Sequence, residues 1–399
     1  MGVLIGIVGK PSSGKTTFLN ALCGTSAKTG DYPFTTIEPN QGVGFVTTPC
    51  VCNELGVTCQ PRNSECIDKI RKIPVKLIDV AGLVPGAYKG RGMGNQFLAD
   101  LAQADILIHV VDTSGSLNEE GENVEPGSHN PMIDISFLED EISQWMNGIL
   151  QKDWARAVRK IQTEKKNIID FITDKFTGLK ISKSDILQAI NESNLDLKNV
   201  PNWTDEEILK LCNFVQKIGK PILIAANKID KPTAKPHLET LQKMFGNFVI
   251  PTTALTDLVL KNLNAQGKID YISESGKLEI SSELSSKEQQ VILKVEKEIL
   301  LPYKTTGVFE TLNRAVFDIL KLIPVYPVAD STHFSDQDGR ILPEVFLVKD
   351  GTTVKELAGI IHQDLFKNFI YGVDAKTNRK LSDKSLIKFG DIIRIVAAV

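Results

Sequence analysis

The sequence predicts an α/β protein built around a phosphate-binding loop, with a helical segment inserted into its first domain and a small mixed domain at its C-terminus. Three observations support this prediction. An apolar, β-branched run at residues 3–8 leads directly into Gly-Lys-Pro-Ser-Ser-Gly-Lys-Thr at residues 9–16. Helical apolar spacing extends from residue 133 to 217, and short β-rich runs alternate with one helical run after residue 325. The predicted boundaries are 1–132 and 218–323 for the P-loop domain, 133–217 for the inserted helical domain and 324–399 for the C-terminal domain.

The composition narrows the class of protein. The chain has 399 residues, of which 42% are hydrophobic and 24% charged, and a net charge of −3. This length suggests two or three domains, and the charge argues against a generally basic nucleic-acid binder, although a local basic patch is compatible with it. No apolar run approaches the ~20 residues of a membrane span, and residues 1–8 lead into the loop rather than to a cleavage site. We therefore expect a cytoplasmic protein that does not interact with membranes.

Residues 9–16 match the P-loop pattern G-x-x-x-x-G-K-[ST] between a strand and a helix. Glycines allow the backbone to curl so that its N–H groups point at phosphate oxygens, and the helix N-terminus adds a partial positive charge. We expect Lys15 to reach the β- and γ-phosphates and the Thr16 hydroxyl to bind Mg²⁺. The predicted nucleotide-binding residues of this segment are Gly9, Lys10, Pro11, Ser12, Ser13, Gly14, Lys15, Thr16 and Thr17.

Two further segments are expected to face the γ-phosphate. Residues 30–40 carry Gly and Pro and should form a loop, in which Thr36, or alternatively Thr35, completes the Mg²⁺ shell. A short strand at residues 74–78 ends in Asp79-Val80-Ala81-Gly82, a D-x-x-G step. Asp79 is expected to hold Mg²⁺ through water. The Gly82 amide is expected to sense the γ-phosphate, because a residue without Cβ allows a close approach. A helix should follow at residues 95–103.

The middle of the chain contains a base-recognition motif. A buried strand at residues 106–111, a long loop at 113–132 and the helical segment precede a strand at residues 221–226. That strand ends in Asn227-Lys228-Ile229-Asp230, an N-K-x-D sequence. The Asp230 carboxylate can accept hydrogen bonds from both N1–H and the N2 amine of guanine, which adenine cannot offer. Asn227 and Lys228 should tie this loop to the P-loop, and after a short strand at 249–251 the weaker motif Thr253-Ala254-Leu255 should contact guanine O6.

The C-terminal third is less regular. Residues 266–300 form a charged sequence that is expected to be helical, and residues 307–323 have a helical apolar pattern. Pro324 and Pro327 interrupt the chain and suggest a domain boundary. Beyond them, strands at residues 344–348 and 392–396 and a helix at 354–365 fit a four- or five-stranded sheet packed on one helix.

The six cysteines fall into two groups. Cys23 and Cys212 lie in helical patterns and should be small buried residues. Cys50, Cys52, Cys59 and Cys66 crowd into one loop, for which zinc binding and a disulfide are both open. Because the spacing lacks the C-x₂-C pairs of common zinc ribbons, free thiols are the default expectation.

The finer sequence resembles one family. Asp-Tyr-Pro-Phe-Thr-Thr-Ile-Glu-Pro-Asn at residues 31–40 and Asp-Val-Ala-Gly-Leu-Val-Pro-Gly at 79–86 resemble the Obg-like P-loop GTPases. Gly-Met-Gly-Asn-Gln-Phe-Leu at 92–98, with the helical insertion and the C-terminal domain, is similar to their YchF subfamily in its archaeal-type form. The resemblance covers nearly the whole chain. It implies a GTPase (G) domain, an inserted helical domain and a C-terminal TGS domain with a ubiquitin-like β-grasp fold. It also implies Mg²⁺ as cofactor, GTP and GDP as ligands, and the ribosome or translation-associated RNA or protein as partner of a monomer.

Three features of the sequence differ from those of other groups of P-loop GTPases. Bacterial and eukaryotic YchF members replace N-K-x-D and prefer ATP, whereas this chain keeps it, so GTP is expected. Ser12 stands where relatives usually carry an Asn that helps bind potassium, which puts potassium activation in doubt. Leu83 stands where Ras-type enzymes have a water-orienting Gln, so hydrolysis should be slow. The water must then be positioned by another side chain, by a backbone amide or by a partner. His129 is a candidate by analogy with relatives, and a solvated surface histidine is the alternative.

The leading functional hypothesis is therefore a slow GTPase switch, in which Mg-GTP orders the loops at residues 30–40 and 82–95. The first alternative is a nucleotide-gated scaffold for RNA or the ribosome with incidental turnover. The second is an ATPase. The scaffold hypothesis predicts full biological activity for a variant that binds GTP without hydrolysing it, and nucleotide competition distinguishes the ATPase.

Overall fold

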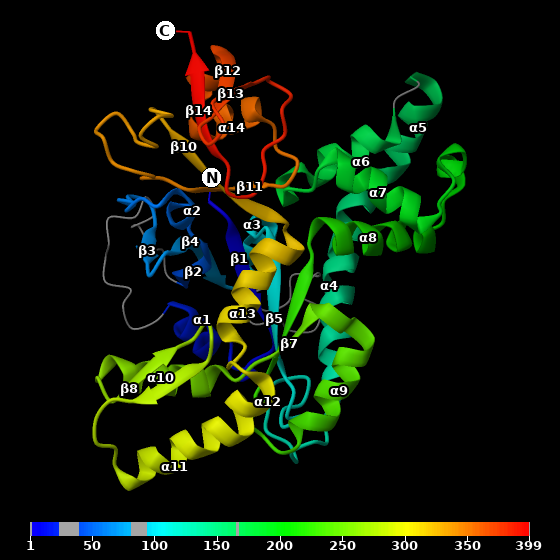
Figure 1. The fold of residues 1–399 in the computed structure, drawn as a ribbon. Helices are drawn as coiled ribbons and strands as arrows, with labels where there is room; N and C mark the ends of the chain where they lie inside the picture. The colour runs from blue at the N-terminus through cyan, green and yellow to red at the C-terminus, as the bar shows by residue number, and fades with distance from the viewer. Residues whose placement is uncertain (1, 24–39, 81–93, 165–166, 399) are drawn as a thin grey trace. The chain divides into compact units, whose positions relative to one another are not determined.

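The computed structural model describes residues 2–23, 40–80, 94–164 and 167–398 and divides into two compact units (Figure 1). We call the first the P-loop unit; it consists of residues 4–24 and 77–311. We call the second the terminal unit; it consists of residues 1–3, 25–76 and 312–399. The helical segment at 133–217 therefore shares a unit with the P-loop, and the C-terminal residues share one with residues 25–76. This division differs from the predicted three domains, whose boundaries remain a prediction.

A parallel sheet forms the centre of the P-loop unit. Its neighbouring strands are β1 (Leu4–Val8), β5 (Ile106–Asp112), β6 (Ile222–Asn227) and β7 (Val249–Pro251). Every residue of β5 is buried, as expected for a parallel strand that is covered on both faces. The carboxyl ends of β1, β5 and β6 lie at the same edge of the sheet, because all three strands run in one direction. The sequence motifs that follow these strands are thereby brought together.

Helices and one hairpin complete the nucleotide-binding part of this unit. The helices are α1 (Lys15–Cys23), α3 (Gly94–Gln103), α9 (Ala234–Phe245), α10 (Ala254–Ala265), α11 (Ser286–Val295), α12 (Leu301–Tyr303) and the start of α13 (Val308–Arg314). The prediction of a helical segment at 266–300 was wrong for its first half, which forms the antiparallel hairpin of β8 (Ile269–Ile272) and β9 (Lys277–Ile280). Ile269 and Tyr271 alternate inward there, so a two-residue period outweighs the charged composition.

The segment at 133–217 is helical, as predicted. It contains α4 (Pro131–Gln151), α5 (Trp154–Glu164), α6 (Ile168–Phe176), α7 (Lys183–Ser193) and α8 (Asp205–Gly219), which gather into a bundle in Figure 1. Capping boxes begin two of these helices: Ser182 with Asp185 on α7, and Thr204 with Glu207 on α8.

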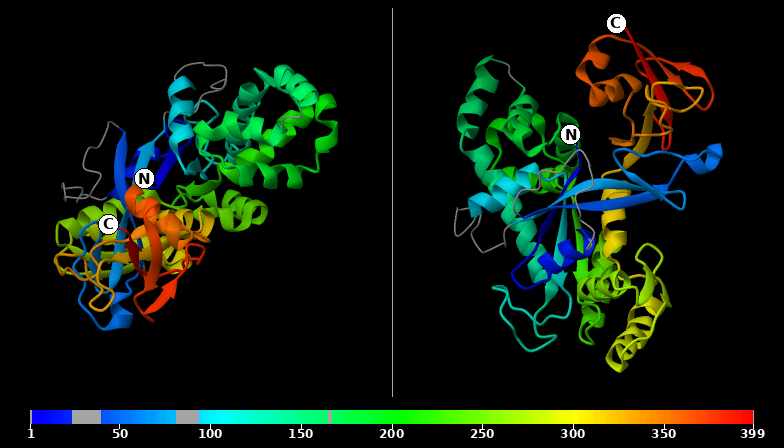
Figure 2. Two further views of the ribbon diagram at one scale, coloured as in Figure 1. Left: turned by 90° about the horizontal axis from the view of Figure 1, so that it is seen from above. Right: turned by 90° about the vertical axis from the view of Figure 1, so that its left-hand side faces the viewer.

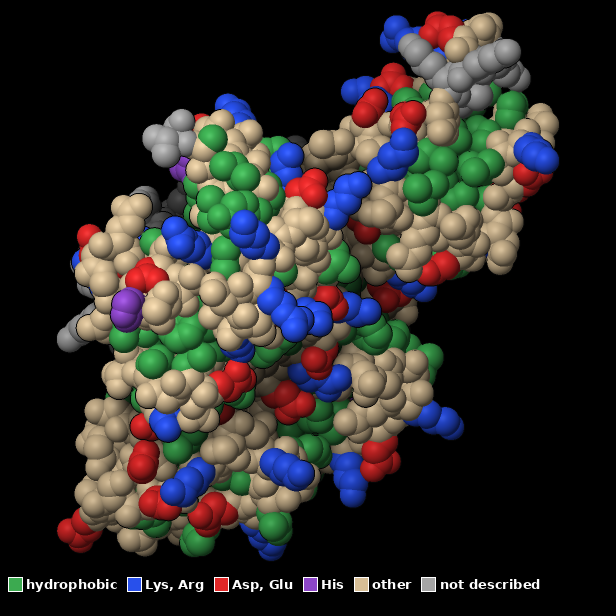
Figure 3. All heavy atoms as spheres, turned by 45° about the horizontal axis from the view of Figure 1, so that its top comes forward, with side chains coloured by type: hydrophobic (Ala, Val, Ile, Leu, Met, Phe, Trp, Pro, Cys, Tyr) green, Lys and Arg blue, Asp and Glu red, His purple; other side chains and the backbone are tan. Residues whose placement is uncertain are grey.

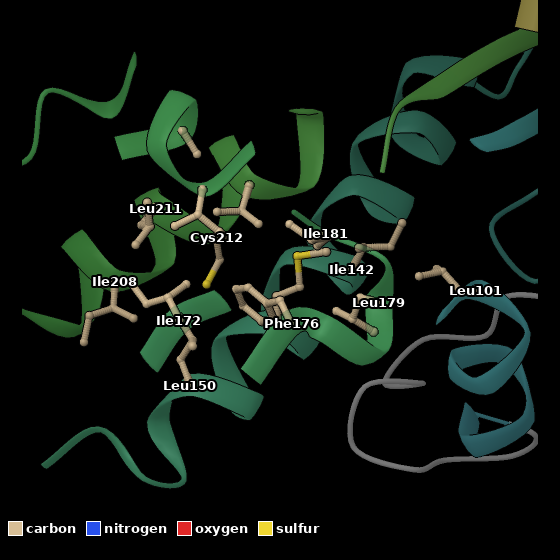
Figure 4. Close-up of a cluster of buried hydrophobic side chains, with 14 of the residues drawn as sticks. Leu101, Ile142, Leu150, Ile172, Phe176, Leu179, Ile181, Ile208, Leu211 and Cys212 are labelled. Atoms are coloured by element: carbon tan, nitrogen blue, oxygen red, sulfur yellow. The ribbon is translucent and has the colours of Figure 1, made fainter. Parts of the chain in front are cut away.

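One hydrophobic cluster joins the bundle to the sheet. Figure 4 shows Phe176 between side chains of several helices, with Leu101 of α3 at the edge of the same group. The cluster continues from these helices to Val8 of β1 and Leu107 of β5. Because this apolar core is continuous, the helical segment packs as part of the P-loop unit.

The terminal unit begins with an antiparallel ribbon. It contains β2 (Gln41–Pro49), the short helix α2 (Cys52–Leu55), β3 (Glu65–Ile67) and most of β4 (Ile70–Asp79). Figure 2 shows β2 and β4 running side by side as long neighbouring strands. The two residues between β3 and β4, Asp68 and Lys69, both have positive φ, which is the backbone of a tight hairpin turn.

The C-terminal residues form a five-stranded sheet in the order β11-β10-β14-β12-β13, packed on α14 (Val354–Ile361). Its strands are β10 (Leu322–Val328), β11 (Phe346–Lys349), β12 (Phe369–Asp374), β13 (Arg379–Leu381) and β14 (Ile392–Ala397), and α15 (Gln363–Lys367) follows α14. The parallel pairing of β10 with β14 and the packing of α14 on the sheet give the predicted β-grasp arrangement.

Pro324 and Pro327 do not interrupt the chain as predicted, because both lie within β10. Residues 322–325 of this strand pair with β11, and residues 326–328 pair with β14. Pro324 lies opposite Leu347 of β11 and Pro327 opposite Ile393 of β14, so the strand changes its ladder partner between the two prolines. A proline is tolerated where the strand has no ladder hydrogen bond to donate.

None of the helices in the described ranges is long and apolar enough to cross a bilayer. On the face shown in Figure 3, Lys and Arg side chains are interspersed with Asp and Glu side chains. This pattern agrees with the small net charge of −3.

Candidate nucleotide-binding site

The P-loop has a backbone that requires glycine at two positions. Gly9 and Gly14 have φ values of 155° and 103°, and Ser12 is left-handed at 60°. A Cβ added to Gly9 would lie 2.5 Å from the Val110 carbonyl oxygen, and one added to Gly14 would lie 2.5 Å from the Asn227 side-chain nitrogen. Both glycines are therefore fixed by close neighbours as well as by φ.

Lys15, Thr16 and Asp79 lie together where β1 meets α1. Lys15 Nζ donates to the Lys10 carbonyl at 3.0 Å, and burial lowers its pKa. The Thr16 hydroxyl donates to Asp79 Oδ2 at 3.1 Å. Burial raises the pKa of Asp79, while the Thr16 hydrogen bond and the charge of Lys15 oppose that shift. A hydroxyl beside a partly buried carboxylate is a donor set that suits Mg²⁺.

The Lys10 side chain points away from the loop interior. Its ammonium group forms an ion pair with Asp134 at 2.8 Å and donates to the Leu117 carbonyl at 2.9 Å. Asp134 also holds His129, with Nε2 and Oδ1 separated by 2.9 Å. Only the backbone of Lys10 is left to face a phosphate, and Asp134 is a residue that the sequence motifs did not identify.

His129 is not the solvated surface histidine considered as an alternative. Its side chain is only 9% exposed and lies against Asp134. Through Asp134 it is connected to Lys10 of the P-loop. The loop that carries it, between β5 and α4, therefore packs against the phosphate-binding loop.

Asn227 joins three segments of the site. Its side-chain nitrogen donates to the Ser13 carbonyl at 3.0 Å, and its side-chain oxygen accepts from the Ala254 N–H at 3.0 Å. The residue itself is 3% exposed. One buried amide thus links the P-loop, the end of β6 and the loop that precedes α10.

Lys228 is held by a group that the motifs also missed. Its Nζ lies 3.2 Å from Asp112 at the end of β5, and its φ is +66°. The Ser114 and Ser116 hydroxyls donate to the same carboxylate at 2.6 and 2.8 Å. Burial alone would raise the pKa of Asp112, but these hydrogen bonds and the Lys228 charge hold it below its usual value. An Asp at the end of the strand beside the N-K-x-D strand is the signal that would have identified it.

Asp230 is the more accessible carboxylate. The Thr253 hydroxyl donates to its Oδ1 at 2.9 Å, Lys231 lies 3.3 Å from its Oδ2, and its side chain is 22% exposed. It borders a cavity of about 610 Å³, a volume suited to a nucleoside. The cavity is lined by Ser12, Gly14, Thr17, Ser114, Ser116, Pro126, Asn227, Lys228, Asp230, Lys231, Pro232, Thr233 and Leu255.

The remaining predicted site residues fall into two groups. Thr36, its alternative Thr35, Gly82 and Leu83 lie outside the described residues. Thr253 begins the loop that Asn227 contacts at Ala254, and Leu255 is 60% exposed at the cavity.

Comparison with known protein families assigns three parts of the chain. Residues 4–136 match a model described as 50S ribosome-binding GTPase. Residues 225–330 match the Obg-like GTPase YGR210-like, G4 motif-containing domain, and residues 332–397 match the TGS domain.

Similar proteins span most of the chain. An uncharacterized GTP-binding protein of Methanocaldococcus jannaschii is 47% identical over 99% of both chains, and one of Schizosaccharomyces pombe is 35% identical over 90% of both. The ribosome-binding ATPase YchF of Mycoplasma pneumoniae is 30% identical over 68% of this chain and 71% of its own.

Two solved structures have a similar fold. The crystal structure of a GTP-binding protein from Pyrococcus horikoshii OT3 has a TM-score of 0.77 and 34% identity, covering 99% of this chain and 100% of that one. The S. pombe YchF GTPase has a TM-score of 0.57 and 20% identity over 99% and 98% of the two chains, and so supports the fold alone. The chain belongs to the YchF subfamily of the Obg-like P-loop GTPases.

Proposed function

We propose that the protein binds GTP together with Mg²⁺ and hydrolyses it slowly to GDP and phosphate, as a nucleotide-dependent switch. The observation that carries this proposal is the linkage through Asn227. This amide holds the loop with Asp230 against both the P-loop and Ala254. The Asp230 carboxylate, which is proposed to recognise the base, is thereby held at a fixed distance from the P-loop backbone, which is proposed to bind the phosphates.

Selection of guanine is assigned to Asp230. Its carboxylate borders the cavity and is oriented by the Thr253 hydroxyl. Two charge-assisted hydrogen bonds to N1–H and the N2 amine would be available to guanine and not to adenine. Lys228, held by Asp112, would pack along the base, and the backbone from Thr253 to Leu255 would contact O6.

Phosphate binding is assigned to the loop at residues 9–17. The P-loop amides would surround the β-phosphate, and Lys15 would exchange its bond with the Lys10 carbonyl for phosphate oxygens. Thr16 and Asp79, with Thr36, would hold Mg²⁺, which supplies charge stabilisation at the phosphates when it is bound. The Gly82 amide is proposed to sense the γ-phosphate.

The water-positioning group is proposed to come from outside the D-x-x-G step. Leu83 has no donor or acceptor with which to orient water. His129 is the candidate side chain, although its contact with Asp134 means that the ring would have to turn from that partner to reach the phosphates.

We further propose that the switch acts in translation, as a cytoplasmic monomer. The support is the family description as a 50S ribosome-binding GTPase and the names of relatives as ribosome-binding ATPases. Those names describe the relatives and the family. The physiological partner, whether ribosome or translation-associated RNA or protein, is what a pull-down with a GTP-locked form would identify.

An ATPase is the second candidate, because YchF relatives from several bacteria carry that name. Competition between GTP and ATP tests the two candidates directly. We expect ATP to bind at least about 100-fold more weakly than GTP, since adenine would leave the carboxylate unpaired.

Asp230→Asn tests the residue assignment. Loss of a charge-assisted pair should cost about 1.5–3 kcal/mol, or roughly 10- to 150-fold in GTP affinity, and shift preference towards xanthosine triphosphate. Asp270→Asn, at an exposed position of β8, is the matched control and should leave both affinities unchanged. Equal GTP and ATP affinity in the unmutated protein would contradict the proposal.

A further inference from the structure

The four cysteines of the terminal unit converge on one point. Cys50 follows β2, Cys52 begins α2, Cys59 lies in the following loop and Cys66 lies in β3. Their four sulfur atoms all lie within 4.8 Å of one another. The four sulfur atoms therefore come from four successive segments of the chain, and no two of the cysteines are adjacent in the sequence.

The spacing of the sulfur atoms suits a tetrahedral metal. The Cys50 and Cys59 sulfurs are 4.0 Å apart and the Cys52 and Cys66 sulfurs are 3.9 Å apart. In a tetrahedral site with zinc–sulfur bonds of about 2.3 Å, the edges measure about 3.8 Å. A disulfide needs sulfurs about 2.05 Å apart, and all six cysteines of the chain are free.

A positively charged side chain, Arg71, lies beside the cysteines and would offset the negative charge of a metal–thiolate site. Arg71 is completely buried, and it pairs with Cys66 across the β3–β4 ladder. One of its guanidinium nitrogens donates to the Leu342 carbonyl at 2.8 Å, while the other two have no hydrogen-bond partner. Within the described part of the chain no carboxylate forms an ion pair with it. The guanidinium carbon lies 5.5 Å from the centroid of the Tyr326 ring, which stabilises the cation in part. A buried cation without a carboxylate partner is still costly, so an anionic neighbour would stabilise it further.

Four thiolates around a divalent ion carry a net charge of −2, which would offset the buried cation. Cysteine binds a metal ion as the thiolate, so binding of the ion would displace the thiol protons and place this negative charge beside Arg71.

We propose that Cys50, Cys52, Cys59 and Cys66 bind one structural zinc ion, with Arg71 as the buried counter-charge beside it. Because all four positions are filled by protein sulfur, the site is closed and has no place for a substrate.

The contacts of the same loop indicate what the ion stabilises. The backbone N–H groups of Gln60 and Arg62 donate to the carbonyls of Ile341 and Pro343 at 2.8 and 2.7 Å. The Asn63 side chain exchanges two hydrogen bonds with the backbone of Val345, at 2.9 and 3.0 Å. All these residues belong to the terminal unit. Zinc would fix both ends of residues 59–66 and so hold this loop in the conformation that pairs with residues 341–345.

The first test is the metal content of the full-length protein, purified under reducing conditions and without a metal-affinity resin. We expect about one zinc per chain after dialysis, because a four-cysteine structural site binds tightly. Titration of the metal-free protein with Co²⁺ should give the visible bands of tetrahedral tetrathiolate cobalt, which added zinc abolishes.

Variants locate the site. Cys59→Ser and Cys66→Ser should each lower zinc affinity by more than about 100-fold, because losing a ligand costs more than losing a supporting contact. Cys23→Ser, at a cysteine of the P-loop unit outside the cluster, is the matched control and should keep full zinc content. Arg71→Gln can still donate to the Leu342 carbonyl, and its zinc affinity should fall by about 10- to 100-fold.

Several results would overturn the proposal. The first is a protein that contains no zinc, has four reactive thiols and gives no cobalt bands. The second is iron bound in place of zinc. The third is disulfides that join these cysteines in the protein isolated under non-reducing conditions. If the variants do not fold, the metal content and cobalt spectrum of the unmutated protein still decide. GTP binding, for which the P-loop and the residues from Asn227 to Asp230 lie in the P-loop unit, serves as the check that a variant retains its P-loop fold.

Discussion

At the scale of single residues, the P-loop lysine and threonine are expected to stabilise charge that develops on the phosphates. Lys15 lies across the loop, and Thr16 contacts Asp79. Their neighbour Lys10 has a different task, because its ammonium group pairs with Asp134 and does not face the loop interior. Two lysines of one motif therefore have different surroundings: Lys10 holds the β5–α4 loop through Asp134, and Lys15 is the one proposed to bind phosphate.

Lys15→Ala and Thr16→Ala should each abolish measurable hydrolysis, because both groups act on the β- and γ-phosphate oxygens, one directly and one through Mg²⁺. Single-turnover cleavage of GTP at saturating protein is the measurement. Lys235→Ala, at an exposed position of α9, should cleave at the unmutated rate. A normal rate in either P-loop variant would refute the site assignment.

Leu83→Ala should leave intrinsic hydrolysis nearly unchanged, because an isobutyl group has no atom that can hold the attacking water. Single-turnover rates of Leu83→Ala and His129→Ala, with and without ribosomes, separate the possible sources of the water-positioning group. A drop of about 100-fold for Leu83→Ala, roughly 2.7 kcal/mol on the barrier, with unchanged GTP affinity would show that this side chain is catalytic.

At the scale of elements, the site depends on the close approach of two loops. The P-loop and the end of β6 meet at Gly14 and Asn227, where a Cβ on the glycine would lie 2.5 Å from the amide nitrogen. The same nitrogen donates to the Ser13 carbonyl. This contact joins segments more than 200 positions apart and would set the distance between the proposed phosphate and base sites.

Gly14→Ala should weaken GTP binding by at least about tenfold, since it combines a left-handed φ with a clash against a buried amide. Isothermal titration with GTP is the measurement. Gly148→Ala lies in α4, where an added Cβ meets nothing within 4 Å, and should bind GTP normally. Unaltered binding by Gly14→Ala would mean that the loop can shift without losing its function.

At the scale of the whole molecule, a buried lysine joins the end of the helical segment to the end of α3. Lys220, between α8 and β6, is completely buried, and its ammonium group donates to the carbonyls of Ala102 and Ala104. Burial lowers its pKa to about 8, and the charge of Asp105 only partly opposes this. The stability of the P-loop unit should therefore depend on pH above neutrality.

Between the folded pKa of about 8 and the usual lysine value, the unfolded chain binds more protons than the folded chain, so the free energy of unfolding rises with pH. The free energy of unfolding, measured by urea denaturation, should rise between about pH 7 and 9.5 by about 2 kcal/mol more in the unmutated protein than in Lys220→Met. Lys210→Met, at an exposed position of α8, should show no such difference. If the free energies of unfolding of Lys220→Met and the unmutated protein differ by the same amount across this pH range, Lys220 does not titrate there.

Features that depend on residues close together in the sequence could be predicted, and features that depend on distant residues could not. The P-loop, the D-x-x-G and N-K-x-D steps and most strands of the parallel sheet were recognisable, because each is a local pattern whose chemistry needs neighbouring residues. The helical insertion was recognisable from its period. The hairpin of β8 and β9 was missed, since its charged residues hide a two-residue alternation of only four residues per strand.

The sequence by itself therefore determined the fold class and the family, because both reside in contiguous motifs, and the residues proposed to carry the nucleotide chemistry come from the same motifs. Tertiary structure alone decided which distant groups complete the site: Asp134 with Lys10 and His129, and Asp112 with Lys228. It also decided that residues 25–76 and 312–399 form one unit, in which four cysteines converge. The physical reason is that a buried charge must find its partner in space, and the chain can place that partner at any distance along the sequence.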